Sequence, residues 1–272
     1  GNLEAAKIEH YAVNAYTSSE LRVDRDGLVR IPEDEGAQHD PIVLQLANSE
    51  TGVLQKITSD VVICDLTQAF GKVRLDFDIL DCEAGLVSAH KLGGPKGIGA
   101  YIVQRGLEVP AQIKGGGQEM GRRSGTENVI GIAGFGAAAA AAARDVEAGA
   151  WDRVEKLRNI LESALEAASN RIIFVGKDVA RLPNTSCFFT PGWKGETQVM
   201  QTDLSGFAIS SGSACSSGKV KASRVLKAMG YSEDEAASAI RVSLGLETTE
   251  EDVLRFADVW TEKLKKHEAR AA

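Results

Sequence analysis

One lysine stands where an apolar run of the chain passes into a glycine-rich turn. Lys91 follows Ser88 and His90 and precedes a turn with four glycines between positions 93 and 99. A lysine amine attacks a carbonyl when it is held in place and partly unprotonated, and a strand end beside an aldehyde cofactor provides both conditions. The glycines let the backbone approach a ligand closely, and the hydroxyl of Ser88 suits a phosphate group. We therefore predict that Lys91 forms a Schiff base, the alternative being an ordinary exposed turn.

An acidic residue ends a second apolar run. Residues 61–64 are apolar and Asp65 follows them, which is typical of a buried parallel strand whose carboxyl end faces a site. In an enzyme that uses pyridoxal phosphate, such a carboxylate keeps the pyridinium nitrogen protonated, so that the ring acts as an electron sink. Gln68, three residues further on, is placed to donate to the phenolate oxygen of the ring.

A third segment presents a thiol among small residues. Cys215 lies between serines and glycines of residues 210–218, and Lys219 and Lys221 follow it, which favours the thiolate. Buried cysteine is the usual alternative, and it suits Cys64 and Cys187, which each lie inside an apolar run. The loop therefore predicts that Cys215 is an exposed nucleophile.

Taken together, these residues resemble the cysteine desulfurases, the NifS/IscS-like pyridoxal-phosphate enzymes of the class V aminotransferase family. The resemblance covers nearly the whole chain, in residues 8–13, 48–52, 65–72, 88–99, 115–128, 210–217 and 240–245. It implies pyridoxal 5'-phosphate as the cofactor. It also implies an α/β chain with the fold-type-I transferase architecture, a large domain with a mostly parallel sheet and a smaller C-terminal α+β domain.

The resemblance gives each matched residue around the cofactor a role. It implies that His10 stacks on the ring and takes part in catalysis, and that Asp65 and Gln68 hold the ring nitrogen and phenolate. It implies that Ser88 and His90 bind the phosphate while Lys91 forms the Schiff base.

Further roles concern the substrate and a second subunit. By the resemblance, Thr126 reaches the phosphate of a partner subunit in a homodimer, Arg241 clamps the substrate carboxylate, and Cys215 takes the sulfur. The planar fork of an arginine suits a carboxylate. Ser49 stands where the family commonly has a second asparagine in contact with cofactor and substrate, and its shorter hydroxyl keeps one hydrogen bond there.

The implied reaction converts L-cysteine to L-alanine and leaves a persulfide on Cys215, for an iron–sulfur scaffold or another sulfur acceptor in thiolation. Two other functions compete: a selenocysteine or cysteine-sulfinate-type lyase that uses the same site, and a cofactor-free relative that acts as a binding partner. Cys215 in a long Ser/Gly loop favours the desulfurase over the lyase.

Composition limits the classes of partner and the cellular compartment that we expect for this chain. The chain has 272 residues, 43% of them hydrophobic, and a net charge of −7, without a basic block that would favour nucleic acid. The four cysteines form neither a disulfide framework nor a metal-ligand pattern, so we expect no metal and a reducing, cytoplasmic compartment. No apolar run reaches membrane-spanning length and residues 1–7 lack a signal-peptide core, so we expect no membrane partner.

The hydrophobic pattern divides the chain into a cofactor-binding domain, residues 1–134, and a C-terminal domain, residues 135–272. The first has strand candidates at 42–47, 61–64, 85–87 and 99–103. A long alanine-rich helix at 128–148, packed closely on its neighbours, connects the two. The second has helices at 154–168 and 250–267 and strands at 172–175, 185–189, 207–210 and 239–244.

Two features of the family have no counterpart in the chain. Neither its cofactor-phosphate loop nor its N-terminal segment precedes His10, and residues 56–60 and 16–21 are too short for the helices expected there. Because parallel neighbours need a crossover of about a dozen residues or more, we expect the intact protein to be longer. A functional deletion variant is the alternative, disfavoured because a sheet that loses its crossovers should lose its strand order.

Overall fold

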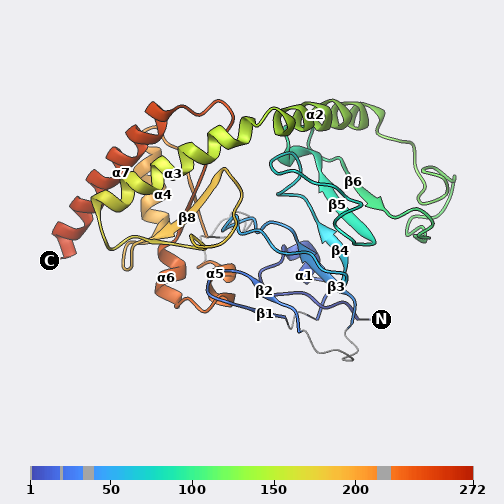
Figure 1. Ribbon diagram of the computed structural model, residues 1–272, viewed down its shortest axis with the longest axis horizontal. Coiled ribbons are helices and arrows are strands. Elements are labelled where there is room, and N and C mark those ends of the chain that lie inside the picture. Colours follow the sequence, from blue (N-terminus) through green and yellow to red (C-terminus); the bar gives the residue numbers. More distant parts are fainter. Residues whose placement is uncertain (1, 19–20, 33–39, 213–221, 272) are drawn as a thin grey trace.

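A computed structural model describes residues 2–18, 21–32, 40–212 and 222–271. Its elements form two halves side by side, each built on a four-stranded sheet (Figure 1). A two-stranded hairpin, β1 (Arg22–Val23) with β2 (Val29–Arg30), lies in the lower centre of the view (Figure 1).

The sheet of the first half has the order β3-β4-β5-β6, with β3 at Ile42–Gln45, β4 at Val61–Asp65, β5 at Ala84–Ser88 and β6 at Gly99–Val103. The first three strands are parallel, as predicted, and β6 is antiparallel to β5. Every residue of β3 is buried, which fits a strand covered on both faces. The parallel register brings the carboxyl ends of β4 and β5 to one edge of the sheet.

The β3–β4 crossover contains no helix. Residues 46–60 instead fold back through an isolated bridge between Ala47 and Leu54, and Val53 then pairs with Arg181 of the second half. Leu54 N–H donates to Ala180 O at 2.8 Å, and Leu182 N–H donates to Gly52 O at 2.8 Å. This extended loop is long enough to return the chain to a parallel neighbour without a helix. That the intact protein is longer stays a prediction.

The sheet of the second half is antiparallel and has the order β7-β8-β10-β9. Its strands are β7 (Ile173–Phe174), β8 (Thr185–Phe189), β9 (Ser210–Ser211) and β10 (Ile240–Ser243). Helices α3 (Ala150–Ala168) and α7 (Glu250–Ala271) cover one face, and Trp260 and Phe188 meet edge to face in the core between them. This half matches the predicted α+β pattern.

Four short α-helices also belong to the described chain: α1 (Tyr11–Asn14), α4 (Gly195–Asp203), α5 (Arg224–Ala228) and α6 (Glu233–Ser238). One hydrophobic cluster joins residues of both predicted domains, including Ile8 and Ile42 with Phe189 and Leu226. The predicted boundary at residue 134 falls inside the connecting helix α2 (Val129–Glu147), so the division into two domains stays a prediction.

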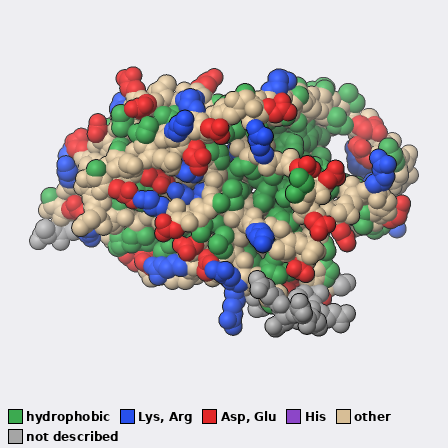
Figure 2. Space-filling model, viewed as in Figure 1, with side chains coloured by type: hydrophobic (Ala, Val, Ile, Leu, Met, Phe, Trp, Pro, Cys, Tyr) green, Lys and Arg blue, Asp and Glu red, His purple; other side chains and the backbone are tan. Residues whose placement is uncertain are grey.

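Helix α2 differs from its prediction in burial. It runs along the top of the first half, and only Gly131 and Ala142 are buried (Figure 1). Ile130 is 88% exposed, so the helix is not packed closely all round. By length and composition alone α2 is apolar enough to cross a membrane, which corrects the statement that no run has that length. Hydrophobic side chains gather along this part of the surface (Figure 2).

Candidate functional site

The predicted cofactor residues of the first half meet at the carboxyl edge of its sheet. Asp65 ends β4, and its Oδ1 accepts a hydrogen bond from Thr67 N–H at 2.9 Å. Ser88 ends the neighbouring strand β5, and its Oγ lies 2.8 Å from Nδ1 of His90. Lys91 closes the short 3-10 helix η1 (Ala89–Lys91) and is exposed. The strand-end hinge expected for Lys91 is therefore present.

His10 stands at the entrance of α1. Its Nδ1 accepts a hydrogen bond from Ala12 N–H at 3.2 Å and caps the helix, while the residue itself stays exposed. The turn before it is pinned from β3, because the Gln45 side chain donates to Ile8 O at 2.9 Å. Asn48 Nδ2 donates to the same carbonyl at 3.1 Å. These bonds fix where the imidazole of His10 leaves the backbone.

Glu9, directly before His10, is a buried acid that sequence reasoning missed. Its Oε2 accepts from Gln45 N–H at 3.0 Å, and its buried Oε1 has no partner among the described residues. The pKa of Glu9 is raised to about 8, mainly by burial and also by the nearby Asp65, against the opposing effects of the Gln45 hydrogen bond and of Arg224. A neutral Glu9 therefore lies beneath the site at pH 7.

Arg241 lies in β10, at the border of the two halves. Its Nη1 donates to the backbone oxygen of Ser49 at 2.5 Å, and its Nη2 donates to Ser210 Oγ at 3.2 Å. Its Nε is buried without a partner among the described residues. Ser49 thus touches Arg241 through its carbonyl, a contact that the sequence did not predict.

A second pair of contacts ties α5 to the first half. Ser223 Oγ donates to Glu50 Oε2 at 2.5 Å, and Arg224 Nη2 donates to Glu9 O at 2.5 Å. The guanidinium of Arg224 also lies 4.5 Å from the ring centroid of Tyr11. Burial raises the pKa of Glu50. Sequence reasoning missed this anchor, although Ser223 and Arg224 follow the cysteine loop after only four residues.

Lys72 is a further missed residue. Its Nζ donates to Gln68 O at 2.8 Å and to Lys91 O at 3.4 Å. The pKa of Lys72 is lowered to about 8, mainly by burial and also by the charge of Lys91. The four-residue spacing from Gln68 was the only signal in the sequence.

Two predicted residues lie away from this group. Thr126 is exposed in the segment between β6 and α2, which extends away from the body (Figure 1). Cys215 lies outside the described residues. Cys64 and Cys187 are buried and free, as predicted, and Cys82 is also buried and free. Burial raises the pKa of Cys187 to about 12, which makes it a poor nucleophile.

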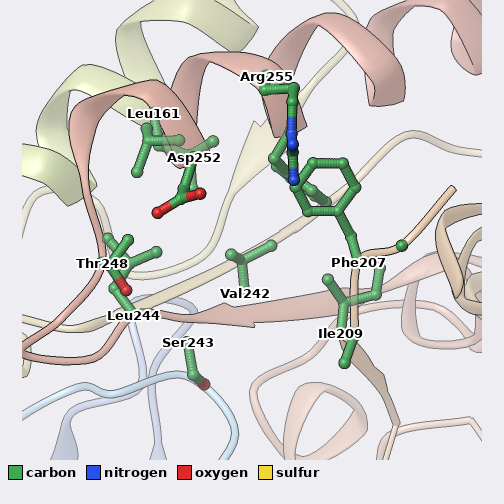
Figure 3. Close-up of a pocket in the computed structure, with 13 residues that line it drawn as sticks. Leu161, Phe207, Ile209, Val242, Ser243, Leu244, Thr248, Asp252 and Arg255 are labelled. Carbon is green, nitrogen blue, oxygen red and sulfur yellow. The ribbon is translucent and has the colours of Figure 1, made fainter.

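The second half contains a cavity of ≈ 240 Å³ on the face of β10 opposite to the Arg241 side chain. Phe207, Ile209 and Val242 line it, and Arg255 of α7 lies over the Phe207 ring, 4.9 Å from its centroid (Figure 3). Neighbouring residues of a strand face opposite sides, so Val242 points into this cavity while Arg241 points toward the first half. The cavity includes none of the predicted site residues.

The residues at the sheet edge fit pyridoxal phosphate. Asp65 offers a carboxylate for a pyridinium nitrogen, and Ser88 and His90 form a polar pair at the next strand end. A Cβ at Gly93 or Gly97 would meet no atom within 4 Å, so the turn after Lys91 borders open space. This donor set, with one exposed amine, has the chemistry that an aldehyde and a phosphate need.

Comparison with known proteins agrees with this arrangement. Residues 21–256 match the aminotransferase class-V family. The chain belongs to that family. It is 34% identical over 270 residues to the cysteine desulfurase IscS of Clostridium botulinum, covering 91% of this chain and 68% of the relative. It is 37% identical over 288 residues to the IscS of Anaeromyxobacter sp. strain Fw109-5, covering 97% and 70%.

Solved structures of similar proteins share the fold of this chain. The X-ray structure of a NifS-like protein from Rickettsia africae has a TM-score of 0.84 and 31% identity, covering 97% of this chain and 76% of that one. SspA, solved in complex with cysteine, has a TM-score of 0.70 and 28% identity, covering 92% and 75%. The fold-type-I prediction is confirmed.

Proposed function

We propose that the chain is a pyridoxal-phosphate-dependent cysteine desulfurase. The observation that carries the proposal is the meeting of Asp65, Ser88, His90 and Lys91 at adjoining ends of β4 and β5, in a class-V chain similar to curated desulfurases. Each turnover breaks the Cβ–S bond of L-cysteine and forms an S–S bond with Cys215. Alanine takes up the proton at Cβ, so no external oxidant or reductant is needed.

The chain's own residues divide the work on the cofactor. The amine of Lys91 attaches it and moves the substrate's α proton, while Asp65 pairs with the ring nitrogen and Gln68 with the phenolate oxygen. Ser88 and His90 hold the phosphate, and His10 stacks on the ring. When bound, pyridoxal phosphate supplies the electron sink for the pair released as the α proton leaves.

Arg241 is the proposed clamp for the substrate carboxylate. Its buried Nε, without a partner among the described residues, supports this role, because a buried guanidinium N–H gains by meeting an anion. Ser49 holds the guanidinium from one side through its carbonyl, and Ser210 holds it from the other. The thiol of Cys215 then accepts the sulfur.

The proposal also covers the oligomeric state, the sulfur acceptor and the cellular compartment. We infer a homodimer in which Thr126 completes the partner's phosphate site, a downstream iron–sulfur scaffold or other sulfur acceptor, and a cytoplasmic setting without nucleic-acid or membrane partners. The acidic net charge of −7 supports the exclusion of nucleic acid. The exposed segment around Thr126 supports contact with a second subunit.

The test uses the purified protein, loaded with pyridoxal phosphate. We expect visible absorbance from the lysine-bound cofactor, a spectral change on adding L-cysteine, and equimolar alanine and persulfide. Cofactor binding followed by turnover of selenocysteine alone would support a selenocysteine lyase. Failure to bind the cofactor would favour the non-catalytic relative and overturn the desulfurase.

A further inference from the structure

The ammonium group of Lys72 connects two segments that hold the cofactor in the proposed function. One is the turn after β4, which carries Gln68, and the other is η1 after β5, which carries Lys91. Lys72 Nζ donates to the carbonyl of each, at 2.8 Å and 3.4 Å. These strands are neighbours, so the two carbonyls border the same edge of the sheet.

Helices α2 and α3 both contact the backbone of Gly71, the residue directly before Lys72. Gly71 has φ +78, and a Cβ there would lie 2.8 Å from Ala142 of α2, so the turn is pressed against that helix. Trp151 of α3 donates from Nε1 to Gly71 O at 2.8 Å. The lysine therefore extends from a turn that two long helices hold in place, toward the segment that ends in Lys91.

The surroundings of the amine favour a geometric role. Lys72 lines a cavity of ≈ 260 Å³ together with Asp152 and Glu155, yet within the described part of the chain it pairs with neither acid. A lysine that only neutralised charge would pair with one of them. Burial lowers its pKa, a cost that a solvated lysine would avoid.

We propose that Lys72 is the positioning residue for Lys91. It holds η1 at a fixed distance from the Gln68 turn, so that the amine of Lys91 and the side-chain amide of Gln68 keep a fixed relative position. The proposal rests on the proposed function for the role of Lys91. The bridge itself is a property of the apoprotein. In catalysis, small displacements of a reacting group cost large factors in rate, which gives such a bridge its value.

The first test measures amide hydrogen exchange by mass spectrometry in the apoprotein. The reporting amides are Leu92 and Gly94, which both donate to Ala89 O. We expect Lys72→Met to exchange several-fold faster in peptides that cover residues 86–94, and Lys72→Arg, which keeps two donors, to lie close to the wild type. Lys56→Met removes an exposed lysine from the β3–β4 crossover and serves as the matched control.

The second test uses the cofactor-loaded enzyme. Lys72→Met should lower kcat at least about ten-fold with little change in KM for L-cysteine, since the substrate clamp is untouched. Lys72→Arg should restore part of kcat. If Lys72→Met lowers the melting temperature by more than a few degrees, Lys72→Gln takes its place in both tests.

The outcomes separate this proposal from the proposed function. Wild-type exchange at residues 86–94 in the Lys72 variants would overturn the bridge, whatever the activity. Faster exchange in a protein that binds no cofactor would support the bridge and overturn the desulfurase. Faster exchange with unchanged kcat would show a structural link that does not position the amine, and would also overturn the proposal.

Discussion

At the scale of single residues, the site combines one exposed amine with several buried ionisable groups. Lys91 is exposed at the end of η1, whereas burial moves the pKa values of Glu9, Glu50 and Lys72 toward their neutral forms. Burial disfavours the charged form of each group, whatever the sign of its charge. The proposed reactive amine of Lys91 is therefore accessible, whereas these three groups are withdrawn from water.

Lys91→Ala should abolish both the visible absorbance of the bound cofactor and all sulfur release. The reason is that the other lysine at this edge, Lys72, directs its amine to two carbonyls. Absorbance spectroscopy with a persulfide assay checks this. Retained absorbance would move the attachment to another lysine and contradict the assignment.

Cys215→Ser should keep the absorbance and still respond to L-cysteine, yet form no persulfide, because a hydroxyl is a poor acceptor for sulfur. Mass spectrometry of the protein after a single turnover detects the added sulfur. Cys187→Ser is the matched control and should keep the persulfide, since that thiol is buried in the core. Alanine release at the wild-type rate from Cys215→Ser would exclude Cys215 as the nucleophile.

The raised pKa of Glu9 should make the free energy of unfolding depend on pH. Its folded-state pKa is raised to about 8 from 4.5, so between these values the unfolded chain binds fewer protons than the folded one. Its contribution to the free energy of unfolding therefore falls as pH rises through that window, by on the order of 1.4 kcal/mol per pH unit.

Urea denaturation between pH 5 and pH 8 measures this contribution. Glu9→Gln keeps an oxygen for Gln45 N–H and stays neutral, so its stability should gain on the wild type as pH rises. Glu251→Gln changes an exposed acid of α7 and should follow the wild type. Parallel curves for Glu9→Gln and the wild type would show that Glu9 is ionised throughout.

At the scale of elements, a buried ion pair fixes α3 to the loop that leads into β8. Arg181 Nη1 and Nη2 donate to the two oxygens of Glu162 at 2.8 and 2.9 Å, and Ser186 Oγ donates to Oε1 at 2.7 Å. Burial alone would raise the pKa of Glu162, but Arg181 and Ser186 outweigh it and lower the pKa. The carboxylate is therefore charged and fully paired.

Glu162→Ala should destabilise the protein by about 3–5 kcal/mol, because it leaves the Arg181 guanidinium buried without its partner. Glu166→Ala, one turn further along α3, removes an exposed pair with Lys177 and should cost at most about 1 kcal/mol. Equilibrium unfolding in urea compares the two. Equal losses would mean that the buried pair adds nothing beyond an exposed one.

The elements also show how far sequence reasoning reaches. The strand predicted at 185–189 is confirmed, and the candidates at 61–64 and 85–87 lie within β4 and β5, because apolar runs bounded by polar turns are local signals. The exposure of α2 was missed, since alanine and glycine favour neither face of a helix. The helices α4, α5 and α6 were missed because they are short and draw their stability from tertiary contacts such as Ser223 with Glu50.

The residues of the candidate site likewise divide into those that the sequence predicts and those that only the fold brings together. Asp65, Ser88, His90 and Lys91 were predictable because each stands at a strand end. The contacts of Glu9, Lys72 and Arg224 were not, because each depends on a carbonyl or amide brought close only by the fold. The roles of all these residues toward cofactor and substrate stay predictions.

At the scale of the whole molecule, the proposed dimer and the cofactor should be linked. A dianionic phosphate needs several donors, and Thr126 offers one from an exposed segment. Anything that binds only the assembled form stabilises it by mass action, so removal of pyridoxal phosphate should loosen the dimer.

Sedimentation with and without cofactor measures this link. Thr126→Ala should weaken cofactor affinity and dimerisation together, whereas Ser59→Ala, which removes an exposed hydroxyl elsewhere, should change neither. A monomer that binds the cofactor with full affinity would show that one chain builds the whole site.

The β3–β4 crossover has a consequence for how such a protein changes over evolutionary time. It joins the two halves through main-chain hydrogen bonds, Leu54 N–H to Ala180 O and Leu182 N–H to Gly52 O. Main-chain groups are the same in every residue except proline, so most substitutions along this seam leave the bonds in place. Side chains are therefore constrained only at particular positions of this contact, such as Gly52, where a Cβ would lie 2.8 Å from Thr185, and Arg181 in its buried pair with Glu162. Genetic separation of the two halves should yield fragments that cannot fold alone.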